Sequence, residues 1–74
     1  MENKKIAQDI YSKIVLELKE KKISQKSVAK EIKMTPQTFS DNMNRLIDGK
    51  FPKMEFLIDV QKVLGVDLGL NFFD

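Results

Sequence analysis

Five polar side chains within residues 37–45 give this chain its clearest chemical capacity: Gln37, Thr38, Asp41, Asn44 and Arg45. The amides of Gln37 and Asn44 can each form two hydrogen bonds with an adenine edge, and Arg45 can contact a guanine or a phosphate. Asp41 is repelled by phosphates and is useful beside a base only as an acceptor from a cytosine amine. The same residue types are also typical of any solvent-exposed helix face. These side chains can therefore be read either as base-contacting groups or as ordinary surface residues.

A helix starting at Pro36 would hold these side chains. Thr35 is a typical N-cap, and Pro36 suits the first helical position because no amide donor is needed there. The apolar residues that recur at helical spacing are Phe39, Met43, Leu46 and Ile47. If Phe39, Met43 and Leu46 point inward, the outermost line is Gln37, Asp41, Asn44 and Asp48. Gly49 then supplies a left-handed residue that closes the helix.

A second helix is predicted just before it, over residues 25–33. Ser24 is a plausible N-cap, and Val28, Ala29 and Ile32 fall on one side of the helix. Only about three residues then connect the two helices, so they must cross at a steep angle, as in a helix-turn-helix. The motif occupies about residues 24–47.

Two further helices complete the expected fold. Residues 4–22 carry a broad apolar face made of Ile6, Ala7, Ile10, Tyr11, Ile14, Val15 and Leu18. Residues 54–64 bury Leu57, Ile58, Val60 and Leu64 in part and end at Gly65. We therefore expect one all-α domain over residues 1–74, a compact bundle of four to five helices.

The composition argues against catalysis and against bound cofactors. Cysteine and histidine are both absent, which removes disulfides, zinc sites, thiol nucleophiles and the commonest general base. The 3 glycines are scattered, so no phosphate-cradling loop exists. We expect no enzyme, no metal, no cofactor and no small-molecule ligand.

The charge distribution fits only a modest electrostatic role. The net charge is +2, divided as +4 over residues 1–33 and −2 over residues 34–74. A basic half can meet a polyanion, but so small a total is not that of a strong nonspecific nucleic-acid binder. No apolar run approaches a membrane span, and residues 1–13 lack the apolar core of a signal peptide, so we expect a cytoplasmic protein without a membrane partner.

The chain resembles the helix-turn-helix of phage repressor and Cro proteins, the lambda-repressor-like fold. Gln25 matches the polar residue that opens the first motif helix, Ala29 the small residue where the two helices touch, and Phe39 the apolar anchor of the second. The downstream run LIDGKFPKMEFLIDVQKVLGVDL resembles the glycine-turned fourth helix of that family. Lys33 departs from the usual glycine at a turn position with positive φ, and the interval from Thr35 to Gly49 is about one helical turn longer than in most relatives.

The resemblance implies a function for each polar surface. The third helix of this family enters the major groove, while the second lies across the phosphate backbone. The implied phosphate contacts are Gln25, Lys26, Ser27 and Lys30, with Lys50 and Lys53 in the connection after the third helix. The leading hypothesis is a DNA-binding regulator of a lysogeny switch, acting as a homodimer on a palindromic operator, to repress transcription or exclude a competitor.

The alternative is an interaction protein. Some temperate phages encode a modulator of repression, an antirepressor that binds the phage repressor rather than DNA alone, and this chain looks similar in length and layout. Exposed Asp41 and Asp48 would suit a basic partner. Leu16 and the apolar tail residues Leu70, Phe72 and Phe73 are candidate oligomer or partner contacts, whereas Leu68 is expected to cover the core. A plain structural or dimerisation domain is a third interpretation.

Overall fold

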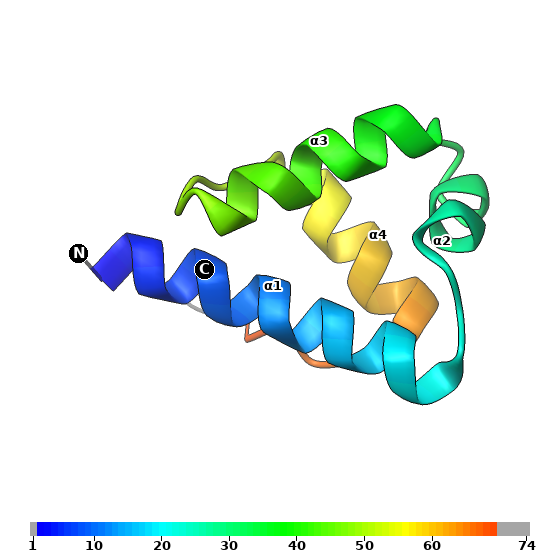
Figure 1. Cartoon of the computed structure of the whole chain (residues 1–74), viewed down its shortest axis with the longest axis horizontal. Helices are drawn as coiled ribbons and strands as arrows, with labels where there is room; N and C mark the ends of the chain where they lie inside the picture. Colours follow the sequence, from blue (N-terminus) through cyan, green and yellow to red (C-terminus); the bar gives the residue numbers. More distant parts are fainter. Residues whose placement is uncertain (1, 70–74) are drawn as a thin grey trace.

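The computed structural model describes residues 2–69, which form four α-helices and no β-strand (Figure 1). The helices are α1 (Glu2–Lys21), α2 (Gln25–Glu31), α3 (Pro36–Ile47) and α4 (Met54–Leu64). Figure 1 shows α1 and α3 along opposite sides, α2 at one end, and α4 crossing between them. Both α1 and α2 pack against α3 and α4. The all-α prediction is confirmed.

One apolar core joins the four helices. Its members from α1 repeat at three- and four-residue intervals, so they lie on one side of that helix. The buried apolar residues are Ala7, Ile10, Ile14, Leu18, Val28, Ala29, Phe39, Met43, Leu46, Phe56, Leu57, Val60, Leu64 and Leu68. Phe39 and Phe56 contribute a T-shaped ring contact with centroids 5.3 Å apart, which ties α3 to α4. This core fixes which side of α3 remains exposed.

The predicted caps of α2 and α3 are confirmed. The Ser24 hydroxyl accepts from the backbone N–H of Ser27 at 3.1 Å, and the Thr35 hydroxyl accepts from that of Thr38 at 3.1 Å. Each bond satisfies one of the amide donors that a helix start leaves without a partner. Pro36 occupies the first helical position, as expected.

Each helix is followed by a residue in the left-handed region. These residues are Lys22, Lys33, Gly49 and Gly65, with φ of 56°, 58°, 82° and 63°. After α3, Gly49 N–H donates to Leu46 at 3.0 Å and Lys50 N–H to Arg45 at 2.8 Å, the paired bonds of a Schellman motif. After α2, Lys33 and Met34 make the matching pair, to Lys30 and Ala29.

The structure differs from the sequence prediction at some helix ends and in the burial of two apolar side chains of α4. The helix predicted over residues 4–22 spans Glu2–Lys21, and the one predicted over residues 25–33 ends at Glu31, because Lys33 turns the chain into the left-handed region. Ile58, predicted to be partly buried, is 36% exposed. Phe56, which the prediction left out, is buried instead, where its ring meets Phe39. Leu68 covers the core as expected, with its backbone N–H bonded to the Gln61 side chain at 3.0 Å.

Candidate nucleic-acid interface

The polar residues of α3 divide into two rows. The outer stripe consists of Gln37, Asp41, Asn44 and Asp48, all of them exposed. The groove stripe consists of Thr38, Asn42 and Arg45, all of which line a hollow between α3 and α4. The two rows exist because the buried face of α3 holds the helix at a fixed rotation. The predicted reading face therefore lies on two adjoining surfaces.

Within the outer stripe, two of the predicted reading residues contact each other. Gln37 Nε2 donates to Asp41 Oδ1 at 3.0 Å, one helical turn further along. This spacing brings side chains together on a helix surface, and such pairs stabilise a helix by about 0.2–0.5 kcal/mol. The contact thus favours one orientation of the Gln37 amide.

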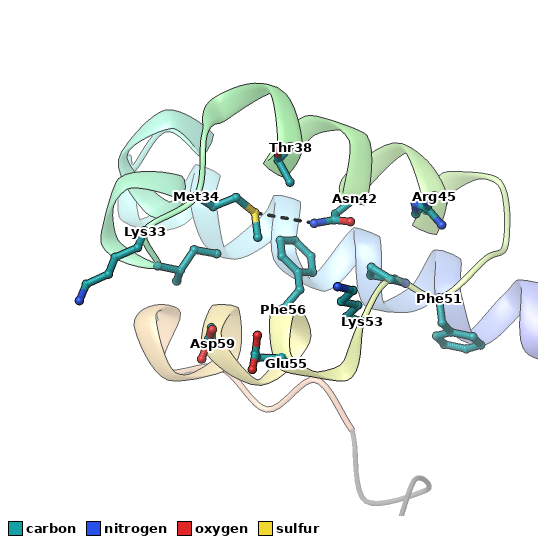
Figure 2. Close-up of a pocket in the computed structure, with 12 residues that line it drawn as sticks. Lys33, Met34, Thr38, Asn42, Arg45, Phe51, Lys53, Glu55, Phe56 and Asp59 are labelled. Atoms are coloured by element: carbon teal, nitrogen blue, oxygen red, sulfur yellow. Dashed lines mark hydrogen bonds between the residues drawn. The ribbon is translucent and has the colours of Figure 1, made fainter.

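A groove between α3 and α4 has a volume of about 520 Å³ (Figure 2). Phe56 lies in the middle of its floor, with Met34 toward one end and Phe51 toward the other. The Asn42 amide points into it and donates to Met34 Sδ at 3.7 Å, a weak bond because a thioether is a poor acceptor. The groove is therefore apolar at its base and polar on its α3 side.

Charges of both signs surround this groove. Arg45 and Lys53 lie at the end near Phe51, and Lys33 lies at the opposite end. The carboxylates of Glu55 and Asp59 come from α4, on the side that faces α3. The groove as a whole has no dominant sign, whereas its end beside the 48–53 connection is basic.

The predicted phosphate contacts of α2 are exposed and partly gathered. Lys26, Ser27 and Lys30 line a shallow hollow together with Met34 and Pro36, so they lie beside the start of α3. Gln25 is exposed at the first position of α2. The Ser27 hydroxyl accepts from the Ser24 hydroxyl at 3.0 Å, which leaves its own proton available for a phosphate oxygen. All four side chains are exposed, and their role as phosphate contacts stays a prediction.

The remaining two predicted phosphate contacts follow α3. Lys50 and Lys53 are both exposed in the connection to α4, and Lys53 also lines the groove. Basic side chains therefore lie beside both ends of α3, from α2 at its start and from the 48–53 connection at its end. Such an arrangement suits an elongated polyanion that runs past α3.

Sequence reasoning missed the part of the groove that α3 does not form, and it missed Asn42. The residues not anticipated are Ile32, Lys33, Met34, Asn42, Phe51, Pro52, Glu55, Phe56 and Asp59. Asn42 lies four residues after Thr38 and three before Arg45, so helical spacing alone placed it in their row. The residues that α4 and the 48–53 connection contribute to the groove depend on the distance between the packed helices. That distance cannot be predicted from a local sequence pattern.

The predicted partner contacts fall on two regions. Leu16 is 54% exposed on α1, as expected, and the other large apolar side chains exposed within residues 2–69 are Ile47, Ile58 and Val63. Leu70, Phe72 and Phe73 lie outside the described residues. Within residues 2–69, no helix combines the length and the apolar character that crossing a membrane requires.

Comparison with known proteins adds no identification. No family model, curated protein or solved structure matches this chain. The case for a function therefore rests on the geometry of α2, α3 and the groove.

Proposed function

We propose that the protein is a DNA-binding transcriptional regulator of the phage repressor and Cro type, which reads operator DNA with α3. The observation that carries the proposal is the exposed polar side of α3, presented between basic residues at both of its ends. Amide and guanidinium groups on a helix are suited to base edges in the major groove, and lysines to the phosphates on either side. The tight connection between α2 and α3 supports a helix-turn-helix.

In this proposal the two kinds of contact have different effects. Lys26 and Lys30 on one side, and Lys50 and Lys53 on the other, neutralise phosphates and set the position of α3. Gln37, Asn44 and Arg45 then distinguish base pairs. Phosphate contacts supply affinity that does not depend on sequence, whereas base contacts supply selectivity.

A single copy of α3 reads too few base pairs for a unique operator. We propose a cytoplasmic homodimer that places two α3 helices in successive major grooves, about 34 Å apart, on a palindromic site. Occupancy alone would then block transcription or exclude a competing regulator.

The salt dependence of binding tests the phosphate contacts. For wild-type protein and labelled random-sequence duplexes, log affinity against log salt should have a slope of roughly −4, since four lysines would each release counterions. Lys30→Ala should make the slope shallower by about one. Lys13→Ala, a charge-matched control on α1, should leave it unchanged. A flat dependence for the wild type, or equal effects of the two variants, would contradict the proposal.

A second candidate is an antirepressor that binds a repressor protein, and the acidic outer stripe of α3 favours it. Asp41 and Asp48 are both exposed, and Ile47, the last residue of α3, is 42% exposed. Exposed carboxylates suit a basic protein partner. One observation distinguishes the two candidates. The regulator by itself should change the electrophoretic mobility of DNA, whereas the antirepressor should do so only together with its partner protein.

A further inference from the structure

The hydrogen bond between Gln37 and Asp41 limits what Gln37 can recognise. A glutamine side chain has two N–H donors and one carbonyl acceptor, so it is equally able to face a donor or an acceptor. The carboxylate of Asp41 is acceptor-only when ionised. Because the two side chains are 3.0 Å apart, the nitrogen of Gln37 must be the atom facing Asp41.

This contact favours one orientation of the amide. Turning the amide of Gln37 over would bring its carbonyl oxygen against the Asp41 carboxylate, two acceptors at hydrogen-bond distance. Held as it is, Gln37 retains one free N–H and the Oε1 acceptor. The remaining pair is one donor beside one acceptor.

Only one purine fits that pair in the major groove. Adenine offers a donor at N6 and an acceptor at N7, so Oε1 and the free N–H of Gln37 can satisfy both. Guanine offers two acceptors, O6 and N7, and would require both N–H groups of Gln37. One of those N–H groups is already donated to Asp41.

We propose that Asp41 is a positioning residue, which holds Gln37 in the orientation that selects adenine over guanine. The inference rests on the proposed DNA-binding function and deepens it, because it assigns a base to one position of the operator. It also gives a reason for a carboxylate on a surface that approaches phosphates. Asp41 acts through Gln37, whereas Gln37 touches the base.

The experiment compares five proteins on duplexes chosen from a random-sequence pool by the wild type. Gln37→Ala first identifies the base pair that Gln37 reads, as the one position where selectivity is lost. The ratio of affinities for adenine and guanine at that position is then measured for wild type, Asp41→Asn and Asp41→Glu, with Asp48→Asn as the control.

Each variant changes one property. Asp41→Asn keeps the size of the side chain, but an amide can donate as well as accept, so Gln37 is free to turn over. Asp41→Glu keeps an acceptor-only carboxylate within reach. Asp48→Asn removes a carboxylate from the same outer stripe without touching Gln37.

The wild type, Asp41→Glu and Asp48→Asn should prefer adenine by about tenfold, the selectivity of one good bidentate contact. In Asp41→Asn the ratio should fall to about threefold or less, through a gain in guanine binding. Asp41→Asn and Asp48→Asn should both raise affinity for every duplex, because each loses a negative charge. Circular dichroism should show that all five proteins are equally helical.

Two results would overturn the inference while leaving DNA binding intact. One is an unchanged ratio in Asp41→Asn, and the other is a wild type that prefers guanine at the position read by Gln37. Absence of any selective binding by the folded wild type is a different result: it would refute the proposed function, and the inference with it.

Discussion

The ends of α1 and α2 and the ends of α3 and α4 use the same backbone conformation with different residues. Lysine occupies the left-handed position after the first two helices, at Lys22 and Lys33, and glycine occupies it after the last two, at Gly49 and Gly65. A residue with a side chain costs roughly 1–2 kcal/mol in this conformation, so glycine is the favoured choice. Glycine is thus not needed at every helix end, although all four ends have the same backbone conformation.

Space around the missing side chain separates the two glycines. A Cβ atom placed on Gly49 would lie 2.5 Å from Cγ and 2.9 Å from Cβ of Lys4, on α1. A Cβ atom on Gly65 would meet nothing within 4 Å. Both the left-handed conformation and the packing against Lys4 therefore require glycine at position 49. At position 65 only the conformation favours glycine.

Gly49→Ala should have the largest effect on stability. The left-handed conformation and the collision with Lys4 together should lower the free energy of unfolding by about 3 kcal/mol, which a domain of this size can hardly sustain. Urea unfolding followed by circular dichroism measures the loss. In the background of Lys4→Ala, which removes Cγ but keeps Cβ, the loss should be smaller; equal losses in both backgrounds would show that the contact with Cγ of Lys4 does not matter.

Gly65→Ala should have an intermediate effect. Only the conformational penalty applies, and the stiffer unfolded chain offsets part of it, so the expected loss is about 1 kcal/mol by the same unfolding measurement. A loss as large as that of Gly49→Ala would contradict the distinction between the two glycines.

Lys33→Gly should have the smallest effect, and with the opposite sign. Relief of the left-handed conformation should exceed the entropy that glycine adds to the unfolded chain, giving a gain of about 0.5 kcal/mol. Lys22→Gly is the matched variant at the end of α1 and should behave alike. Destabilisation by both would mean that the lysine side chains stabilise the fold through contacts of their own.

The sequence predicted the parts of the fold that local rules govern. The caps Ser24 and Thr35 and the helix-ending residues Gly49 and Gly65 could be predicted, because capping depends only on residues nearby in the sequence. Lys33 adopts positive φ, the conformation that repressor and Cro proteins often have at the turn position it resembles, although the residue type alone argues against it.

The errors arise where one element meets another. The stretch from Met54 to Val60 is mostly apolar, so spacing does not decide between Phe56 and Ile58 as the buried residue. The ring of Phe39 on α3 decides in favour of Phe56. The groove between α3 and α4 was not foreseen for the same reason, since it depends on helix separation.

The candidate site was predicted as a list of exposed residues but not as an arrangement. Helical periodicity placed Gln37, Asp41 and Asn44 in one row, and the structure agrees. Neither the bond from Gln37 to Asp41 nor the position of Arg45 in the groove follows from periodicity, because each depends on side-chain orientation. What these residues bind stays a prediction.

The most direct test of the account is the fluorescence anisotropy of labelled random-sequence duplexes with the wild type and with the double variant Gln37→Ala, Asn44→Ala. Both substituted side chains are exposed, so the fold should survive their removal. We expect the wild type alone to bind selectively and in a salt-sensitive manner, and the double variant to keep the weak nonspecific binding while losing selectivity. A folded wild type that binds no duplex unless a second protein is added would contradict the account and favour the antirepressor.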